Sequence, residues 1–557
     1  MSLSANIARH LAAYAGTHPA QPALKVPRGR RAGRIDYLEL TYAELSAEVA
    51  AQRSRLARAG LRPGDRTLVM VRQGLPLLAV VFALFELGAV PVVIDPGMGR
   101  KSFLRCVAQS RPRALVGIPA ARLAAWFFRS AFRGVELRIG VSGATTARLT
   151  GPGATRPADA PPAVECAPGD LAAILFTSGS TGAPKGVCYT HGQFDAQVRL
   201  IRETYGIEPG EVDLPLLPLF ALFAPALGMT TVVPELDPSR PALADPARLV
   251  QAIRQENVTT SFGSPTLWGN LAAHCRSTGQ ILPSLRRVLC AGAPVPMWLW
   301  ETLPAVMPNG VLQSPYGATE VLPVSTLSAA EVLNGTALET LRGGGVCVGT
   351  VLPQNRVKII APSDGPIRRL EEARELPLGE VGEIIVTGPT VTTNYDALPE
   401  ADALAKIAGP DGAVWHRMGD LGRFDSAGRL WFCGRKVETV YIEGGPVYPA
   451  CVEPLFDTHK AVRRCALIGI GPAAHRRAAL VVEPVHRDWM RTSSDCRRLA
   501  RELRAIALQQ AHTTAIRVFY FREALPVDVR HNAKIHRLAL ARWAAQGAVG
   551  HEANPKR

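Results

Sequence analysis

Lysine is scarce in this chain of 557 residues, although basic residues as a class are abundant. Of the 63 basic residues, nine are lysine and 54 are arginine, and together they exceed the 47 acidic residues to give a net charge of +16. This excess admits nucleic acid, an anionic membrane or an acidic small molecule as a partner. Because the lysines are so few, each can be inspected as a candidate catalytic cation.

Cysteine motifs and secretion signals are missing. The ten cysteines form no Cys-x-x-Cys pair and no Cys/His cluster with zinc-like spacing, which favours reduced, mostly buried thiols in a cytosolic protein. The first sixteen residues, MSLSANIARHLAAYAG, contain no cationic segment that leads into an apolar core. A secretory signal is therefore not expected.

Long uninterrupted apolar runs are also rare. The run Leu75–Phe85 is too short to cross a bilayer, and the run Leu214–Pro234 contains four prolines, so no transmembrane segment is expected. The second run could still line an apolar pocket. With 47% hydrophobic and 20% charged residues, and with 50 glycines and 45 prolines in no repeat, the chain is neither intrinsically disordered nor fibrous.

Helix-like and strand-like segments alternate through the first hundred residues. Thr41 and Glu44 form a capping box before a helix that reaches Gly60, the strand TLVMV follows, and a second helix leads to the strand VPVVID. This alternation predicts an α/β fold with parallel-type sheets. Shorter strand-like runs, EVGEIIVTG and RLWFCG, occur between residues 350 and 434. The Gly- and Pro-rich segment Gly143–Gly169 indicates an exposed connection between lobes.

The charge excess is concentrated near the C-terminus. Residues 451–557 contain 19 basic and nine acidic residues, a net charge of +10. In the segment DCRRLARELRAIALQQ the arginines alternate with apolar residues at a helical period. We therefore expect many of these arginines to form the solvated face of a helix.

A loop rich in Gly, Ser and Thr follows the apolar strand LAAILF and precedes a helix-like segment. Its small residues allow backbone N–H groups to approach an anion, and its hydroxyl groups and lysine suit a polyphosphate. The Walker order Gly-Lys-Ser/Thr is absent, and a flexible surface turn is the alternative interpretation. The candidate residues are Thr177, Ser178, Gly179, Ser180, Thr181, Gly182 and Lys185.

Later segments could complete a nucleotide site. Residues 316–320, YGATE, combine an aromatic face, a glycine that permits close approach, a hydroxyl and a carboxylate, although alone they also fit an ordinary loop. Asp420 follows a glycine and could accept hydrogen bonds from sugar hydroxyls. Arg435 is a fixed cation shortly after it, and Lys534 is a lysine near the C-terminus.

Taken in order, these motifs resemble the adenylate-forming superfamily, which includes acyl-CoA synthetases, luciferases and the adenylation domains of peptide synthetases. The matching segments are TSGSTGAPKG, AGAP at 291–294, YGATE, GEIIVTGP at 382–389, GD at 419–420, GR at 434–435 and the late lysine. The resemblance implies a large ATP- and acyl-binding N-terminal domain of several subdomains at 1–434. It also implies a small, mobile α+β domain at 435–557 that carries the catalytic lysine.

The same resemblance implies a role for each candidate residue. The Gly-rich loop would hold the β- and γ-phosphates of ATP, Thr319 would contact the α-phosphate, and Glu320 would bind Mg²⁺. Lys534 would reach the substrate carboxylate and the α-phosphate and would stabilise the transition state. The nucleotide-binding set is completed by Tyr316 on the adenine, by Gly317, by the backbone around Gly292 and Ala293, and by Asp420 and Arg435 on the ribose.

Three departures from the family pattern concern transfer of the acyl group. The pivot position two residues after Arg435 is usually Asp or Lys, but here it is Val437. The loop GGPVYP at 444–449 is one residue shorter than usual, and Asn532-Ala533 replaces Ser-Gly before the late lysine. The adenylation residues are intact, whereas the residues associated with thioester formation are altered.

These departures, the Pro-rich apolar run and the ending RHNAKIHR resemble one branch of the superfamily, the β-lactone synthetases of olefin biosynthesis. The branch implies ATP- and Mg²⁺-dependent adenylation of a 2-alkyl-3-hydroxy long-chain fatty acid. Attack by the acid's own β-hydroxyl then gives a β-lactone, AMP and pyrophosphate. The branch further implies a cytoplasmic enzyme that associates with a reductase and a β-lactone decarboxylase in a soluble assembly.

Two alternatives stay open. If Val437 and the short loop are neutral changes, the chain is a long-chain fatty acyl-CoA ligase. A binding protein that recruits nucleic acid or membrane through the basic C-terminal region is a different class, but no aromatic-basic platform is present and no nucleic-acid partner is expected. A Ser-His-Asp hydrolase is disfavoured because G-x-S-x-G is absent. We interpret His191 as a helix-start residue.

Overall fold

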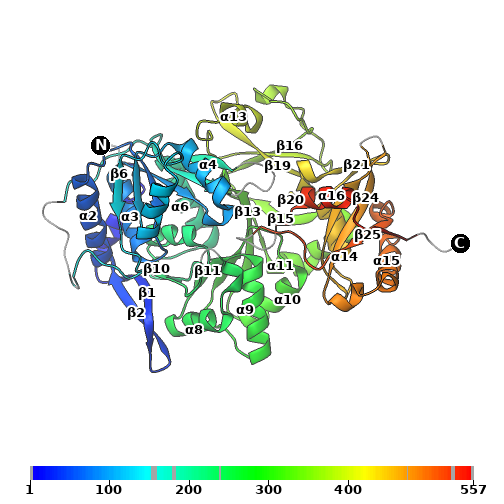
Figure 1. Ribbon diagram of the computed structural model, residues 1–557, viewed down its shortest axis with the longest axis horizontal. Coiled ribbons are helices and arrows are strands. Elements are labelled where there is room, and N and C mark those ends of the chain that lie inside the picture. Colours follow the sequence, from blue (N-terminus) through cyan, green and yellow to red (C-terminus); the bar gives the residue numbers. More distant parts are fainter. Residues whose placement is uncertain are drawn as a thin grey trace.

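The protein is described by a computed structural model that covers residues 4–553 except 152, 154–159, 178–183, 238–239, 473–474 and 529–533. Two sheets, each packed against helices, form the larger part of the molecule. A four-stranded sheet with its own helices lies at the right-hand end of Figure 1. Helices and parallel strands alternate along the first sheet, which confirms the predicted α/β class.

The first sheet has six strands in the order β6-β5-β3-β4-β7-β8 and is parallel except for the β7–β8 pair. Its strands are β3 (Arg66–Met70), β4 (Val90–Ile94), β5 (Ala114–Gly117), β6 (Leu137–Gly140), β7 (Leu171–Thr177) and β8 (Lys185–Thr190). The helices that precede or follow these strands are α2 (Tyr42–Arg58), α3 (Leu75–Glu86), α4 (Arg100–Ser110) and α5 (Pro119–Phe127).

Two helices of this region follow directly from sequence. Helix α2 begins at the capping box predicted for Thr41 and Glu44, in which each residue satisfies a backbone N–H of the other. Helix α3 is apolar on every side, and all of its residues are buried. The shorter apolar run is therefore a core helix.

The prediction that Gly143–Gly169 connects two lobes is wrong. This segment joins β6 to β7, and both strands belong to the six-stranded sheet. A parallel strand can join a sheet only through a long crossover, and here the crossover passes from the edge strand β6 to the far side of β4. Gly- and Pro-rich composition marks an irregular segment but carries no information about which strands it joins.

The second sheet has fourteen strands, with a parallel section from β1 to β13 and an antiparallel section from β13 to β16. The parallel section and its edge contain β1 (Pro22–Arg31), β2 (Arg34–Thr41), β9 (Val212–Asp213), β10 (Thr230–Val232), β11 (Thr260–Gly263), β12 (Arg287–Cys290) and β13 (Val311–Ala318). The remainder contains β14 (Val321–Ser328), β15 (Val346–Val351), β16 (Arg356–Ile360), β17 (Gly382–Thr387), β18 (Lys406–Ala408), β19 (Val414–Phe424) and β20 (Arg429–Arg435).

Helices cover the parallel section and bury its core. They are α6 (His191–Tyr205), α7 (Phe223–Leu227), α8 (Pro246–Glu256), α9 (Pro265–Thr278) and α10 (Met297–Val306), and the shorter helices α11 (Ala329–Glu331), α12 (Ala337–Glu339) and α13 (Pro399–Ala405) follow. The predicted residues Gly292 and Ala293 come directly after β12, where Gly292 has φ of 98°, a conformation that favours glycine. Strand β13 ends beside them because β12 and β13 run parallel.

The C-terminal sheet has the order β23-β24-β25-β26. Its strands are β23 (Val462–Ile470), β24 (Arg477–Pro484), β25 (Val518–Phe521) and β26 (His551–Glu552). Its helices are α14 (Pro449–Phe456), α15 (Ser493–Ala507) and α16 (Arg537–Ala545). A hairpin of β21 (Val440–Ile442) and β22 (Gly445–Val447) precedes these elements. On α15, Arg497, Arg498 and Arg501 are exposed as predicted. Arg504 is buried instead and donates to the carbonyls of Thr514 and Ile516 at 2.8 and 2.7 Å.

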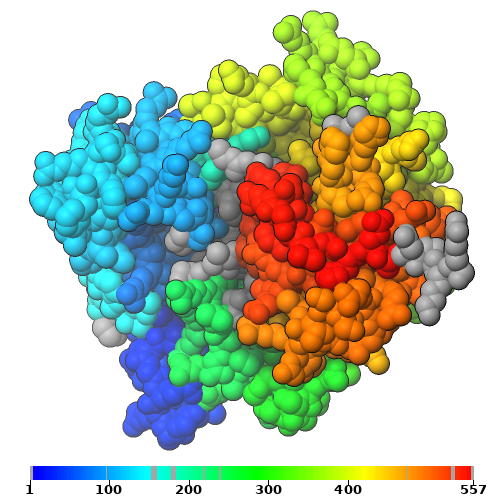
Figure 2. All heavy atoms as spheres, turned by 45° about the vertical axis from the view of Figure 1, so that its right-hand side comes forward, coloured from blue at the N-terminus to red at the C-terminus, as the bar shows by residue number. Residues whose placement is uncertain are grey.

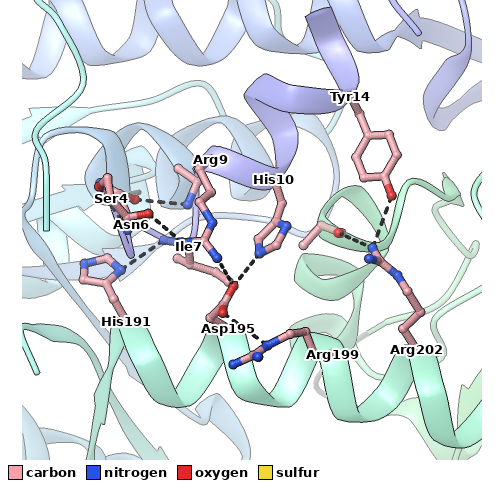
Figure 3. Close-up of polar contacts among 12 residues, drawn as sticks. Ser4, Asn6, Ile7, Arg9, His10, Tyr14, His191, Asp195, Arg199 and Arg202 are labelled. Atoms are coloured by element: carbon pink, nitrogen blue, oxygen red, sulfur yellow. Dashed lines mark hydrogen bonds and ion pairs between the residues drawn. The ribbon is translucent and has the colours of Figure 1, made fainter. Parts of the chain in front are cut away.

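Residues of the N-terminal helix α1 (Arg9–Thr17) form polar contacts with α6 (Figure 3). Asp195 accepts a hydrogen bond from Arg9 at 2.6 Å and pairs with His10 at 2.8 Å, and the backbone N–H of Ile7 donates to Nδ1 of His191 at 3.2 Å. His191 is the first residue of α6, which confirms its interpretation as a helix-start residue. Burial lowers the pKa of His191 to about 4, so it is a neutral acceptor here.

All ten cysteines are free and buried, as predicted. Within the described ranges, no helix is both long enough and apolar enough to cross a membrane.

Candidate active site

An apolar pocket lies beside the parallel section of the large sheet. Phe220 stacks on Phe262 of β11 in its wall, with ring centroids 3.6 Å apart. The pocket also reaches Pro315 of β13, the residue before Tyr316. The Pro-rich apolar run lines this pocket as the sequence suggested, through Phe220, Phe223, Ala224, Leu227 and Met229.

Asp213 adds a carboxyl group to this apolar lining. It lies on β9, opposite Thr260 of β11. Burial and the neighbouring Glu211, which forms an ion pair with Arg287, raise the pKa of Asp213 to about 8. Asp213 is therefore mostly protonated at neutral pH and can donate a hydrogen bond into the pocket. Sequence reasoning missed it because the apolar run begins one residue later.

Replacement of Asp213 by asparagine is expected to favour the folded protein increasingly as pH rises from about 5 to 8. Folded Asp213 keeps its proton to a pKa of about 8, whereas an unfolded aspartate loses it near pH 4. Between these values the wild-type protein loses up to about 1.4 kcal/mol of stability for each pH unit, and asparagine has no proton to lose. Apparent melting temperatures of both proteins across this range measure the effect.

The matched control for this prediction is Asp411→Asn. Asp411 is exposed, and its pKa is lowered by backbone hydrogen bonding and by Arg356, so it is ionised in both the folded and the unfolded state over this range. Its replacement is expected to shift melting by the same amount at each pH. A difference between wild type and Asp213→Asn that is likewise independent of pH would contradict the assigned protonation of Asp213.

Asp420 of β19 contacts two other predicted nucleotide-binding residues, Tyr316 of β13 and Arg435 of β20. The hydroxyl of Tyr316 donates to Oδ2 of Asp420 at 2.6 Å, although the two residues are 104 positions apart. Nη1 of Arg435 lies 3.0 Å from Oδ1 of Asp420, because the antiparallel register places these residues opposite each other. Burial raises the pKa of Asp420 and Arg435 opposes that rise, while Asp420 raises the pKa of Arg435.

The chain turns sharply at Thr319 and Glu320, between β13 and β14. Gly317 is required before this turn, because a Cβ there would lie 2.6 Å from the backbone oxygen of the first residue of β14. Tyr189 of β8 donates its hydroxyl hydrogen to the carbonyl of Thr319, and the N–H of Thr392 donates to the carbonyl of Glu320 at 2.9 Å. Two other segments therefore fix the tip of the turn.

Two lysines flank an aromatic ring beside Glu320. The hydroxyl of Tyr395 donates to Oε1 of Glu320 at 2.6 Å, and the Nζ atoms of Lys185 and Lys406 lie 4.6 and 5.5 Å from the centroid of the same ring. Lys406 also donates to the carbonyl of Thr392 at 2.5 Å. Burial lowers the pKa of Lys406 to about 8, and Glu320 opposes this shift. Two cations beside one carboxylate suit a polyphosphate that carries a divalent metal.

Lys534 reaches this site from the C-terminal part of the chain. Its backbone N–H donates to Oδ1 of Asp528 at 2.8 Å, and the N–H of Asp528 donates to its carbonyl at 3.0 Å. The Lys534 charge acts on Asp420 and favours its ionised form. The late lysine therefore lies within electrostatic range of Asp420 on β19.

The predicted phosphate loop lies largely outside the described residues. This applies to Ser178, Gly179, Ser180, Thr181 and Gly182, and to the side chain of Thr177. At its ends, Thr177 of β7 pairs in register with Lys185 of β8. Strand β8, in which residues 186–189 are buried, follows the loop, and the predicted helix, α6, begins at His191 directly after β8. Strands β7 and β8 pair antiparallel.

Comparison with known proteins shows the family of this chain. Residues 11–396 match the family of AMP-binding enzymes. The chain belongs to this family. It is 45% identical over 559 residues to an olefin beta-lactone synthetase of Stenotrophomonas maltophilia (strain K279a), covering 98% of this chain and 99% of the relative. It is 43% identical over 561 residues to an olefin beta-lactone synthetase of Xanthomonas campestris pv. campestris, covering 99% of each.

A solved structure confirms the fold. The amide bond synthetase McbA from Marinactinospora thermotolerans matches with a TM-score of 0.77 at 24% identity, covering 97% of this chain and 99% of that chain. At this identity the likeness concerns the fold of this AMP-binding enzyme and not its reaction. The resemblance to adenylate-forming enzymes is thus confirmed, whereas the individual roles predicted for the site residues stay predictions.

Sequence reasoning missed Lys406 and Tyr395 in this AMP-binding enzyme. Lys406 is one of only nine lysines, so its scarcity was an available signal. Tyr395 lies six residues after the matched GEIIVTGP segment. Its position in the sequence indicates neither its hydrogen bond to Glu320 nor its place between two lysines.

Proposed function

We propose that this AMP-binding enzyme is a β-lactone synthetase. It adenylates a 2-alkyl-3-hydroxy long-chain fatty acid with ATP and Mg²⁺ and then closes the lactone, releasing AMP and pyrophosphate. The observation that carries the proposal is the junction of the apolar pocket with the charged turn: Pro315 lines the pocket, and Tyr316 and Glu320 follow it in the chain. An acyl chain in the pocket would present its carboxylate at this turn. Relatives that are 43–45% identical over nearly their whole length support the same reaction.

ATP would bind across the strands that meet at this turn, as membership of the AMP-binding family supports. Tyr316 would stack on the adenine, and Lys185 with the loop that precedes it would hold the β- and γ-phosphates. Asp420 and Arg435 would hold the ribose. In the described part of the chain, the buried Oδ1 of Asp420 receives no hydrogen bond, although it forms an ion pair with Arg435. A ribose hydroxyl is a donor that would satisfy this oxygen.

The residues at the turn also fit Mg²⁺. This ion is usually bound by one or two carboxylates together with phosphate oxygens. Among the residues described, no group of three His, Cys, Asp or Glu side chains could hold a metal ion, so Glu320 and the nucleotide would share it. When bound, the ion would offset phosphate charge and favour departure of pyrophosphate.

The reaction then needs a cation at the point of attack. A carboxylate oxygen of the substrate attacks the α-phosphorus, and the bond to pyrophosphate breaks. Lys534 would lie between these two anions and stabilise the charge that develops in the transition state. The β-hydroxyl oxygen next attacks the acyl carbon, AMP departs and the hydroxyl proton is released. Because the attacking group is already attached to the substrate, no second acceptor has to bind.

We also propose the predicted division into domains 1–434 and 435–557. One hydrophobic cluster lies entirely between residues 440 and 553, and Arg537 joins Glu438 to Glu453 within the same part of the chain. Val437, at the expected pivot, is half exposed. Association with a reductase and a β-lactone decarboxylase, and a cytoplasmic location, stay predictions.

The decisive experiment is product analysis with ATP, Mg²⁺ and a 2-alkyl-3-hydroxy acid, with and without CoA. We expect a β-lactone and one equivalent of AMP in both reactions, identified by NMR under conditions mild enough to preserve a lactone that loses CO₂ on heating. CoA is expected to change neither the product nor the rate. A thioester as the only product would instead establish the long-chain acyl-CoA ligase.

A further inference from the structure

Helix α5 presents an apolar stripe to solvent. Leu123, Trp126 and Phe127 are 56%, 50% and 65% exposed. They are spaced at i, i+3 and i+4, which places them on one face of the helix. The opposite face contains the buried Ala121 and Ala125, which allow the helix to pack closely on β5 and β6. The larger apolar side chains therefore point away from the core.

The two aromatic rings of this stripe are held by local contacts. Trp126 and Phe127 meet edge to face with centroids 4.9 Å apart. The guanidinium of Arg129 lies 5.3 Å from the Trp126 ring centroid, and its Nε–H donates to the Trp126 carbonyl at 3.3 Å. The rings are therefore pre-organised with a cation directly beside them.

The surrounding chain has an extreme charge balance. Residues 100–140 contain nine basic residues and one acidic residue, which is half of the net charge of the whole protein. The single acid, Glu136, is paired with Arg113 at 2.9 Å. The exposed cations on α5 and the segment that follows it are Arg122, Arg129, Arg133 and Arg138. In Figure 2 the azure and cyan surface to which α5 belongs forms an outer edge of the molecule, across a hollow from the C-terminal residues.

We propose that this α5 patch, Leu123, Trp126 and Phe127 with the arginines around them, docks the enzyme on the surface of an anionic lipid bilayer. Tryptophan favours the membrane interface, apolar side chains of an amphipathic helix insert at the headgroup level, and arginines are attracted to anionic headgroups. The aliphatic side chain in the stripe and the edge-to-face aromatic pair favour a lipid surface over nucleic acid, which would require open ring faces for stacking. This inference does not depend on the proposed reaction.

The test is co-sedimentation of the full-length protein with vesicles. One set contains phosphatidylcholine alone, and the other contains equal parts of phosphatidylcholine and phosphatidylglycerol. We expect binding to the anionic vesicles to be at least about tenfold tighter and to weaken as salt is raised. Equal binding to both sets, or binding to DNA but not to vesicles, would overturn the proposal.

Paired variants locate the binding surface. Trp126→Ser with Phe127→Ser removes the apolar part, and Arg129→Glu with Arg133→Glu reverses the charge beside it. Each pair is expected to weaken vesicle binding by about tenfold or more, with melting temperatures near that of wild type because these side chains are exposed. If one double variant melts at a lower temperature than wild type, its loss of vesicle binding is disregarded and the other double variant tests the α5 patch.

The matched control is Arg497→Glu with Arg501→Glu on α15. This helix is also basic, but the ring beside its arginines, that of Trp489 at 5.7 Å from Arg498, is half-buried and not exposed like Trp126 and Phe127. Its charge reversal is expected to leave vesicle binding within about twofold of wild type. If the α15 pair loses binding and the α5 pairs keep it, the surface is on the C-terminal part of the chain and the α5 patch is excluded.

Discussion

Lys534→Ala is expected to lower the rate of adenylate formation by about 10²–10³-fold, the loss typical when one pre-organised electrostatic contact to a transition state is removed. Two anions must approach for the carboxylate to attack the α-phosphate, and a cation between them offsets their repulsion. The charge of Lys534 acts on Asp420, one of the residues proposed to bind the nucleotide. AMP release and pyrophosphate exchange with a 2-alkyl-3-hydroxy acid measure the effect.

The matched control is Lys460→Ala. Lys460 belongs to the same C-terminal part and is also one of the nine lysines, but it is exposed. Its removal is expected to leave the rate within about twofold of wild type, the usual range for a surface charge. A direct measurement of ATP binding separates the two roles of Lys534: binding is expected to change much less than the rate. Near-normal turnover of Lys534→Ala would refute its catalytic assignment.

Glu320→Gln is expected to reduce the rate by about 10²-fold and to raise the Mg²⁺ concentration needed for half-maximal activity. The amide keeps the shape of the side chain but loses the negative charge that attracts the metal ion. It would also leave Lys185 and Lys406 close to each other without the carboxylate that favours the charged form of Lys406. Steady-state rates over a range of Mg²⁺ concentrations separate a loss of metal affinity from a loss of rate.

Two further variants test the role of Glu320: one is expected to have a smaller effect and the other none. Tyr395→Phe keeps the carboxylate but removes the hydroxyl that donates to it at 2.6 Å, and a smaller loss of about tenfold is expected. Glu301→Gln changes an exposed glutamate on α10 and is expected to have no effect. If Glu320→Gln shows an unchanged Mg²⁺ dependence, the metal ion is held elsewhere and the assignment of Glu320 is wrong.

Local signals predicted local structure well. The capping box at Thr41 and Glu44, the apolar strand that ends at Thr177 and the amphipathic helix α15 were all predictable, because a cap or a hydrophobic period depends on residues a few positions apart. Composition failed for Gly143–Gly169, which joins two strands of one sheet and does not connect two lobes. Which strands such a segment joins depends on the order of strands in the sheet, and that order is set by pairing between segments that are remote in the chain.

The candidate site shows the same contrast. Its motifs could be read one by one, since residue type and spacing define an anion-binding loop, a turn with a carboxylate and a late lysine. The contact of Tyr316 with Asp420, the two lysines around Tyr395 and the raised pKa of Asp213 could not be read, because they arise from strand pairing and burial.

The small number of lysines made each one easy to inspect, but the structure was needed to find which of them lie near the candidate site. By itself the sequence determined the family, the order of its motifs and two candidate catalytic lysines. Tertiary structure decided that a third lysine, Lys406, lies half-buried beside Glu320, and that an aromatic pair is exposed on α5 with arginines around it. The physical reason is that the chemical character of a side chain is fixed by its residue type, whereas its neighbours and its burial depend on how segments remote in the chain pack together.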